Sequence, residues 1–240
     1  MEFRKEGAVY YSILSLIADG KNTSGEIDSV LGITTSAYLR NLEINYTLLK
    51  KMRPIFASER SKGVKYKLND NFLQFWFRFI YPNLDLVENH RSDLLLDIVK
   101  KGYDVYSGLV LERYFQQKLW EEERFTIIGN WWDSKGENEI DIVAVNRIDR
   151  TARIAEVKIN RNKISMPVLK EKSQKLIRRV KKISDRIYRL LIGGYVRYGI
   201  KAFTPLFMVR LSAGRYTMDY NMTRLELYIS SIAFFRNLPE

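Results

Sequence analysis

Two apolar runs separated by a short polar segment constrain the fold of this 240-residue chain more than any other feature. The first run covers residues 140–145 and the second covers residues 152–159, while residues 146–151 between them are polar and typical of a turn. Short apolar runs of this kind favour β-strands, and a turn between them favours an antiparallel hairpin. We therefore expect the second half of the chain to contain a sheet built around this hairpin.

Charged side chains interrupt both runs. Asp141 lies in the first run, and Glu156 and Lys158 lie in the second. The hairpin is expected to set Asp141 and Glu156 on neighbouring strands, and the alternation of side chains is expected to point Glu156 and Lys158 to the same face. Two carboxylates and a lysine at one place suit a divalent metal and an activated water, which is chemistry for cutting a phosphodiester. The alternative is a solvated face, the usual role of a single Glu-x-Lys in a strand.

These residues resemble the motif of the PD-(D/E)xK nuclease superfamily. In that pattern an acid on one strand and an acid-x-lysine on the next hold magnesium, and a further acid comes from a preceding helix. Asp141 matches the first acid, Glu156 and Lys158 match the acid-x-lysine, and Glu112 matches the helical acid. The resemblance implies that Asp141, Glu156 and Glu112 bind Mg²⁺ or Mn²⁺, and that Lys158 acts with them in catalysis.

Several details of this resemblance stay open. Ile140 stands where the name of the motif has proline, a position that varies widely in the superfamily. Glu137 and Glu139 are alternative auxiliary ligands. Glu112 lies off the apolar stripe of the helix expected over residues 103–122, so it points either to the edge of the sheet or to water. The backbone carbonyl of Val157 is a further possible ligand.

Composition excludes several other kinds of site. Cysteine is absent and His90 is the one histidine, so thiolate and histidine zinc sites are excluded and Ser-His catalysis is disfavoured. A metal here must be a hard ion held by oxygen ligands. No signal peptide and no run of about 18 apolar residues is present, so we expect a cytoplasmic protein with no membrane contact.

The positive charge of the chain is concentrated in one region. The net charge is +12, and residues 147–190 hold 15 Lys or Arg against 4 Asp or Glu. Phosphate neutralisation supplies most non-specific affinity for nucleic acid, so a polyanion, with DNA favoured, is the expected partner. A solvated helix face is the alternative. The expected contacts in this region are Lys163, Lys170, Lys175, Arg178, Arg179 and Lys182.

Residues 1–82 resemble a winged helix-turn-helix domain. Thr23 and Glu26 have the spacing of a capping box. We expect helices over 8–19, 23–31 and 36–50, then strands over 53–56 and 64–68 joined by a turn at 60–63. The last helix and the wing imply nucleic-acid contacts, and protein docking is the alternative role of such a domain. The implied contacts are Tyr38, Arg40, Asn41, Arg60, Lys62 and Lys65.

A wider resemblance covers nearly the whole chain. Residues 68–83, and a series made of Trp131-Trp132-Asp133, Gly136-Glu137, Glu139-Ile140-Asp141 and Glu156-Val157-Lys158, resemble the carboxy-terminal region of a family of archaeal and bacterial P-loop ATPases. That region joins a winged helix to a nuclease-like domain of the DUF234 type. No G-x-x-x-x-G-K-[ST] motif is present, so this chain is expected to hold no ATP site. The resemblance implies a P-loop ATPase as a partner, either as another domain or as a separate subunit.

The expected fold class is α/β (α+β): the winged helix, a helical connector over 83–102, and a PD-(D/E)xK domain over 103–240 with a central mixed sheet flanked by helices. Further strands are expected over 125–132, 189–196 and 202–211. Ser165 and Pro167 indicate the start of a helix, in which Gln174 matches a polar position of related nucleases. The expected buried stripe of this helix is Leu169, Leu176, Val180, Ile183 and Ile187.

Two functions remain from the sequence alone. The first is a metal-dependent DNA endonuclease or nuclease-like domain associated with a P-loop ATPase. The alternative is a catalytically inactive DNA- or protein-binding module that regulates an ATPase. Trp131 and Trp132 fit either base stacking or a strand with one Trp in the core and one outside.

Overall fold

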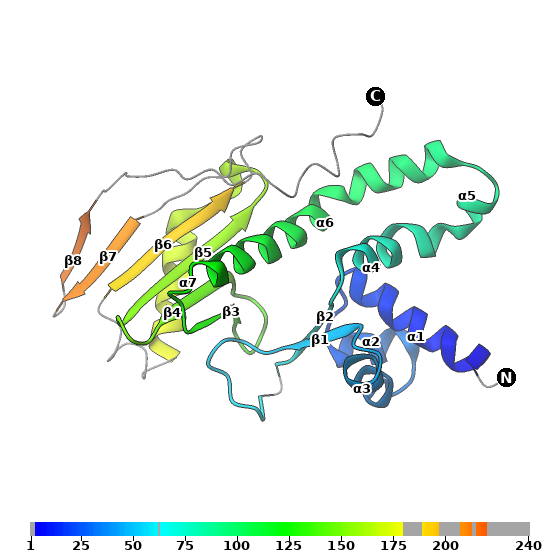
Figure 1. Ribbon diagram of the computed structural model, residues 1–240, viewed down its shortest axis with the longest axis horizontal. Coiled ribbons are helices and arrows are strands. Elements are labelled where there is room, and N and C mark those ends of the chain that lie inside the picture. Colours follow the sequence, from blue (N-terminus) through cyan, green and yellow to red (C-terminus); the bar gives the residue numbers. More distant parts are fainter. Residues whose placement is uncertain (1–2, 62, 180–188, 197–206, 213–214, 220–240) are drawn as a thin grey trace. The chain divides into compact units, whose positions relative to one another are not determined.

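The computed structural model describes residues 3–61, 63–179, 189–196, 207–212 and 215–219 (Figure 1). The chain is mixed α/β, with helices and a small hairpin first, then a long helix, then a sheet. It divides into two compact units, Met1–Val110 with Trp132–Glu137, and Leu111–Trp131 with Asn138–Glu240. Across the described ranges, none of the helices has the length and apolar character needed to cross a bilayer.

The first unit begins with the helices α1 (Phe3–Ala18), α2 (Ser24–Leu31) and α3 (Ser36–Ile44). The predicted capping box starts α2, because the Thr23 hydroxyl accepts from the Glu26 N–H while the Glu26 carboxylate accepts from the Thr23 N–H. Gly32 ends the same helix at a φ of +67°, a conformation that glycine adopts without strain. The sequence prediction for this helix is therefore confirmed at both ends.

The hairpin after α3 differs from the predicted one. Strands β1 (Leu49–Met52) and β2 (Lys65–Leu68) pair antiparallel with Leu49 beside Leu68, so the predicted helix over 36–50 was too long and the predicted strand over 53–56 was misplaced. The Asn41 carbonyl accepts from two successive N–H groups, and Thr47 follows at a φ of +53°. Both features end the helix early and leave the buried Leu49 free to enter a strand.

The aromatic segment after the hairpin packs on α1. It consists of α4 (Asn71–Phe75), a π-helical turn over Trp76–Ile80 and a 3₁₀ turn over Tyr81–Asn83. Gln74 is buried, and its Nε2 donates to the Ala18 carbonyl at 2.9 Å. Arg78 Nη1 donates to the same carbonyl at 2.8 Å, so two side chains satisfy the carboxy-terminal end of α1.

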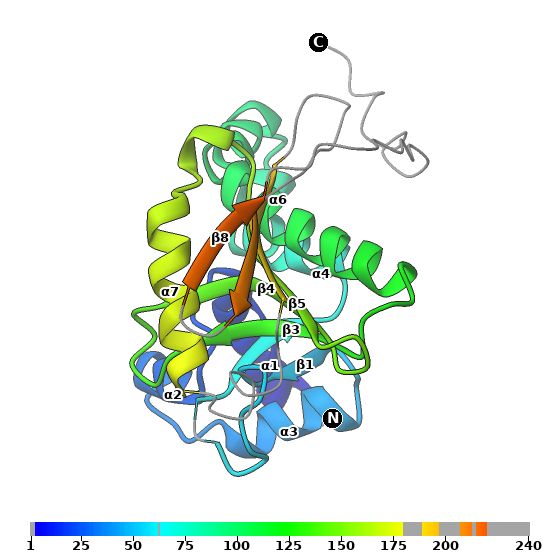
Figure 2. The same ribbon diagram turned by 90° about the vertical axis from the view of Figure 1, so that its left-hand side faces the viewer.

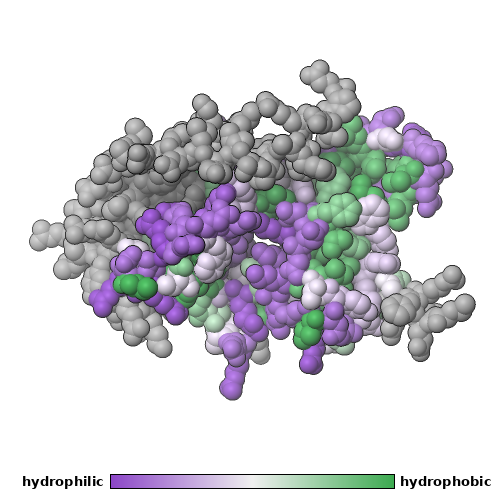
Figure 3. Space-filling view, in the orientation of Figure 1, coloured by the Kyte–Doolittle hydropathy of each residue, from purple (hydrophilic) through white to green (hydrophobic). Residues whose placement is uncertain are grey.

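A single long helix replaces the predicted connector and the helix after it. After α5 (Leu84–Glu88), α6 runs unbroken over Ser92–Glu121. Gly102 does not interrupt α6, and it is needed there because an added Cβ would lie 2.6 Å from the ring of Phe79. The first half of α6 also carries exposed apolar side chains, and hydrophobic surface is visible over this region in Figure 3. The exposed residues are Leu94, Leu96, Val105 and Leu109.

The second unit contains a sheet of order β3-β4-β5-β6-β7-β8. Its first three strands, β3 (Ile127–Trp132), β4 (Glu139–Asn146) and β5 (Thr151–Lys158), include the predicted hairpin. Strand β6 (Arg189–Val196) runs parallel to β5, and β7 (Phe207–Ser212) and β8 (Arg215–Asp219) continue antiparallel. The strand predicted over 202–211 is thus described from Phe207, while residues 202–206 lie outside the described ranges.

Helices cover both faces of this sheet. Figure 2 shows α7 (Met166–Arg179) on one face and the end of α6 on the other. On the α6 face, Phe115 and Leu119 pack with the strand residues Ile142, Ala144 and Ala155. On α7, Leu169 and Leu176 are buried as predicted, whereas Val180, Ile183 and Ile187 lie outside the described residues.

The two tryptophans at the end of β3 are both buried, at 3% and 5% exposure, so of the two alternatives left open by the sequence, the one that places a Trp outside was wrong. Trp132 belongs to the first unit, where its Nε1 donates to the Gly63 carbonyl at 3.0 Å. The ammonium of Lys65 lies 4.8 Å from the Trp132 ring centre. Trp132 is therefore held by a hydrogen bond and a cation–π contact, which the alternation of side chains along a strand does not predict.

Candidate functional site

The β4–β5 hairpin positions the predicted acids. Its pairing runs from Asn146 with Thr151 to Ile142 with Ala155. The predicted turn is present, and the Asn146 side chain accepts from the N–H groups of Ile148 and Asp149 at 2.9 Å each. Continuing this register by one residue sets Asp141 beside Glu156.

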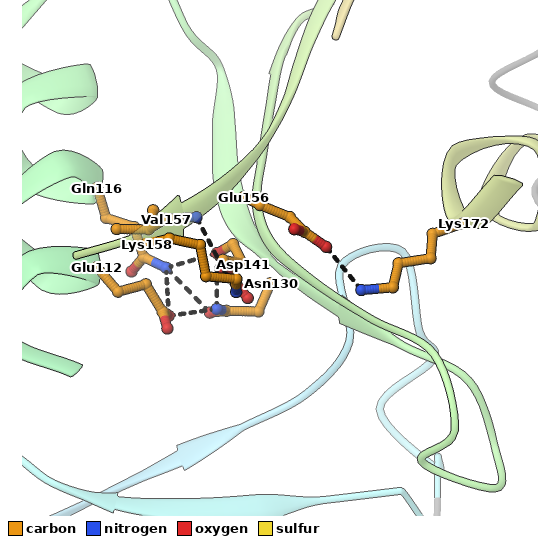
Figure 4. A network of polar contacts seen from close by, with 8 residues as sticks. All are labelled: Glu112, Gln116, Asn130, Asp141, Glu156, Val157, Lys158 and Lys172. Carbon is orange, nitrogen blue, oxygen red and sulfur yellow. Dashed lines mark hydrogen bonds and ion pairs between the residues drawn. The ribbon is translucent and has the colours of Figure 1, made fainter. Parts of the chain in front are cut away.

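Asp141 lies where the backbone pairing of the two strands ends. Its Oδ2 accepts from the Val157 N–H at 2.8 Å and from Lys158 Nζ at 3.0 Å (Figure 4). A side-chain carboxylate thus takes the place that a backbone carbonyl would hold in a continued ladder. This arrangement fixes the Asp141 carboxylate between the strands, next to the lysine ammonium.

Two amide side chains, those of Asn130 and Gln116, connect Asp141 to Glu112 by hydrogen bonds. The Asn130 amide donates to the Asp141 carbonyl at 2.8 Å and to the Glu112 carboxylate. Gln116 Nε2 donates to Asn130 Oδ1 at 3.0 Å and to Glu112 Oε1 at 3.2 Å. Glu112 therefore points toward the sheet, one of the two orientations that the sequence left open (Figure 4).

Lys158 is held in its charged form. Burial acts to lower its pKa, but the attraction and hydrogen bond of Asp141 oppose burial, together with the charges of Glu156 and Glu112. The balance raises the pKa of Lys158 above the ordinary value of a lysine. At neutral pH this side chain is a fixed cation and a hydrogen-bond donor.

Glu156 points elsewhere. It is only 4% exposed, and its Oε1 accepts from Lys172 Nζ of α7 at 2.7 Å. Figure 4 shows the side chains of Glu156 and Lys158 extending away from each other, so the expectation that they share a face was wrong. Lys158 is the last residue of β5 and lies beyond the end of the β4–β5 pairing, and its ammonium contacts Asp141.

The donor set fits a hard divalent cation in chemistry, because Glu112, Asp141 and Glu156 all offer carboxylate oxygens. The arrangement is incomplete, since Glu156 is engaged with Lys172. In the part of the chain that the structure describes, no three His, Asp or Glu side chains are grouped to hold a metal. Glu137 is exposed in the turn before β4, and Glu139 is the half-buried first residue of that strand.

The predicted nucleic-acid contacts of the second unit lie on and before α7. Lys163, Lys175 and Arg178 are exposed, and Lys170 is half-buried. Lys175 Nζ lies 2.9 Å from Glu171 Oε1 and 3.1 Å from Asn138 Oδ1. Lys182 and the side chain of Arg179 fall outside the described residues, and Gln174 is exposed on α7.

The predicted contacts of the first unit are mostly engaged in packing. Asn41 Nδ2 donates to the Tyr10 hydroxyl at 2.9 Å, and the Tyr38 ring meets the Tyr10 ring edge-on at 5.3 Å. Arg40 and Arg60 are exposed, Lys65 lies over Trp132, and Lys62 is outside the described residues. Arg40, midway along α3, is therefore exposed, while Tyr38 and Asn41 hold α3 on α1.

Sequence reasoning missed three residues of the polar network, Gln116, Asn130 and Lys172. Gln116 follows Glu112 by one helical turn, a spacing that signals a shared face. Asn130 is a buried polar residue inside a strand, which needs hydrogen-bond partners. Nothing in the sequence separates Lys172 from the other basic residues of α7, because its role depends on the packing of that helix.

Residues 76–177 match the family DUF234, described as archaea bacterial proteins of unknown function. An uncharacterized protein of Methanocaldococcus jannaschii, MJECL04, is 38% identical over 164 residues, which is 64% of this chain and 36% of that protein. The chain thus spans about a third of the length of this relative. No solved structure matches the chain. The matched segment includes all of α6, strands β3 to β5 and most of α7, so the chain carries a DUF234 domain over residues 76–177.

Proposed function

We propose that the second unit is a nuclease-like domain of the PD-(D/E)xK type that acts on phosphodiester bonds of nucleic acid. The observation that carries this proposal is the contact of 3.0 Å between Asp141 Oδ2 and Lys158 Nζ on neighbouring strands. Glu112, from the preceding helix, joins the same hydrogen-bonded group through Asn130. A helical acid, a strand acid and a lysine, in this order along the chain, are elements of the motif.

Each side chain has a distinct role in this proposal. Asp141 holds Lys158 in place, and Lys158 donates a hydrogen bond to a phosphate oxygen and neutralises the charge that develops there. Asn130 and Gln116 keep Glu112 and Asp141 oriented. Mg²⁺ or Mn²⁺ held by Asp141, Glu156 and Glu112 would lower the pKa of a bound water and offset the charge of the phosphate.

DNA is the proposed substrate because of the charge on α7. The exposed side chains Lys175 and Arg178 and the nearby Lys163 supply cations for a phosphate backbone. In the first unit, three helices followed by a hairpin support a winged-helix assignment. Arg40 and Arg60 are its proposed phosphate contacts. This gives the chain two basic surfaces, one in each unit.

Association with a P-loop ATPase is the proposed context. The series from Trp131 to Lys158 resembles the carboxy-terminal region of such ATPases. The M. jannaschii relative extends well beyond the segment that this chain matches. A separate domain or subunit would supply ATP hydrolysis, because this sequence has no P-loop motif.

A binding module without cleavage activity is the second candidate, and one specific observation favours it. Glu156 is buried and paired with Lys172, so one carboxylate of the motif is already satisfied without a metal. In this second candidate, the carboxylates and their partners stabilise the fold and do not catalyse cleavage, and the domain binds DNA or an ATPase. The two candidates share the DNA-binding surface and differ in turnover.

Cleavage of supercoiled plasmid in Mg²⁺ or Mn²⁺ separates the candidates. We expect the wild-type chain to nick plasmid, Lys158→Met to lose about 10²- to 10³-fold in rate, and the control Lys100→Met, at an exposed position of α6, to cleave with nearly the wild-type rate. Circular dichroism checks that each variant is folded. No turnover in the wild-type chain, together with salt-dependent DNA binding, would support the binding module instead.

A further inference from the structure

The Glu156–Lys172 pair joins a buried anion to an accessible cation. Glu156 has 5% of its side chain exposed and Lys172 has 22%, and their charged atoms lie 2.7 Å apart. A buried carboxylate is stable only with a partner, because desolvation penalises its charge. Lys172 can meet an anion that arrives from solvent, whereas Glu156 depends on the contact that it already has.

The backbone position of Glu156 does not prevent it from reaching Asp141. Extending the hairpin register from Ile142 and Ala155 sets residues 141 and 156 side by side, and opposite residues of antiparallel strands are within side-chain reach. Side-chain rotation, with the strands unmoved, is thus the change needed to bring the two carboxylates together. The ion pair with Lys172 is what opposes that rotation.

We infer that Lys172 is a positioning residue that keeps Glu156 away from Asp141 until a phosphate group of the nucleic acid takes the place of Glu156 on the lysine. This inference rests on the proposed function and adds a regulation to its site. Phosphate is the matching anion because Lys172 donates charge-assisted hydrogen bonds to oxygen. Lys175 and Arg178 lie further along α7 and continue a line of cations for the neighbouring phosphates.

The exchange couples substrate binding to metal binding. Once phosphate holds Lys172, Glu156 loses its partner, and its carboxylate would be available, with that of Asp141, to hold a divalent cation. Coupling between two ligands is reciprocal, so metal must favour substrate binding as much as substrate favours metal binding. The domain would then assemble its cleavage site only on nucleic acid.

Titration calorimetry with Mn²⁺, in the absence of DNA, tests the restraint on Glu156. Lys172→Met removes the restraint, and we expect its Mn²⁺ dissociation constant to be at least about tenfold lower than that of the wild-type chain, a change of about 1.4 kcal/mol. Lys172→Arg keeps an ion pair and should bind Mn²⁺ like the wild type. Lys172→Met with Glu156→Gln should lose the gain.

A labelled DNA duplex in Ca²⁺, a hard cation that carboxylates hold, tests the phosphate contact while Glu156 has a cation to turn to. Lys172→Met should bind the duplex more weakly than the wild-type chain, and the slope of log affinity against log salt should fall by about one phosphate contact. Lys100→Met, at an exposed position of α6, is the matched control and should leave the slope unchanged. If Lys172→Met also leaves the slope unchanged, phosphate does not replace Glu156 and the inference is overturned.

The results for the restraint and for the proposed function can be told apart. Measurable Mn²⁺ binding that is equal in wild type and Lys172→Met overturns the restraint and leaves the proposed function standing. No Mn²⁺ binding by any variant, with no plasmid cleavage, removes the proposed function and the restraint together. If Lys172→Met is unfolded by circular dichroism, Lys172→Gln replaces it, since a neutral donor still satisfies Glu156 but holds it less strongly.

Discussion

Asp141 accepts hydrogen bonds from a backbone N–H and a lysine with the same carboxylate oxygen. This arrangement makes Asp141 both the structural end of the β4–β5 pairing and the centre of the candidate site. Its carbonyl is equally engaged, because Asn130 and Gln116 both donate to it. Substitutions around Asp141 therefore affect stability as well as activity, and each needs a control for folding.

Asn130 offers a test of the polar network by stability alone. Asn130→Ala removes an amide that donates to both the Glu112 carboxylate and the Asp141 carbonyl, so each of these acceptors loses one of its donors. We expect the free energy of unfolding to fall by about 1–3 kcal/mol. Urea denaturation measures this loss, and the exposed Asn162→Ala should change the free energy of unfolding by less than about 0.5 kcal/mol.

The raised pKa of Lys158 predicts a specific dependence of stability on pH. Because the pKa in the folded protein lies above the unfolded value of about 10.4, the stabilising contribution is full below the unfolded pKa. It is lost as pH rises through the folded pKa. The stability difference between wild type and Lys158→Met should therefore shrink above roughly pH 10. Denaturation at a series of alkaline pH values checks this, and a constant difference would contradict the assigned ion pair.

At this scale the sequence predicts identities better than orientations. The motif identified Asp141 and Lys158, which are in contact, and Glu112, which shares their network. Alternation in β5 led to the wrong orientation for Lys158, because the rule assumes a strand that continues past that residue. The partner of Glu156 depends on how α7 packs on the sheet, and no local pattern encodes that packing.

Among the helices and strands, the sequence predicts an end accurately where a specific capping residue marks it, and less accurately where only apolar spacing indicates it. The capping box and Gly32 fix α2 at both ends. Helix α3 ends at Ile44, earlier than its apolar spacing suggests, because the burial of Leu49 beside Leu68 favours the strand. Helix α6 extends through the predicted connector and is not interrupted at Gly102. A glycine is needed at this position because the ring of Phe79 leaves no room for a side chain.

The cap of α2 gives a prediction at the scale of one element. Thr23→Ala removes the side-chain acceptor of the Glu26 N–H and a hydroxyl donor to the Glu26 carboxylate. We expect a loss of about 1 kcal/mol in the free energy of unfolding. Thermal denaturation measures it against Ser24→Ala, an exposed first-turn position whose substitution should change stability far less. Equal losses in the two variants would show that the cap contributes nothing.

For the whole molecule, the distribution of charge is the feature that bears on function. Residues 147–190 carry nearly the entire net charge, and the described part of α7 presents Lys175 and Arg178 to solvent. Electrostatic binding to DNA should therefore weaken steeply with salt. An affinity indifferent to salt would contradict a phosphate-binding surface.

A double substitution locates the surface that binds DNA. Lys175→Ala with Arg178→Ala should weaken DNA binding and reduce the slope of log affinity against log salt by up to about two phosphate contacts. The exposed α6 pair Lys100→Ala with Lys101→Ala removes the same charge elsewhere and is the matched control. Fluorescence polarisation of a labelled duplex measures both variants, and equal effects would show that net charge matters and position does not.

The most direct test of the account is the rate of Mg²⁺-dependent plasmid nicking by Asp141→Asn. This substitution keeps the size of the side chain but removes the charge that holds Lys158 and would bind the metal. We predict a loss of about 10²- to 10³-fold, with Glu171→Gln, an exposed acid of α7, retaining the wild-type rate. Nicking by Asp141→Asn at the wild-type rate would contradict the assignment of this site.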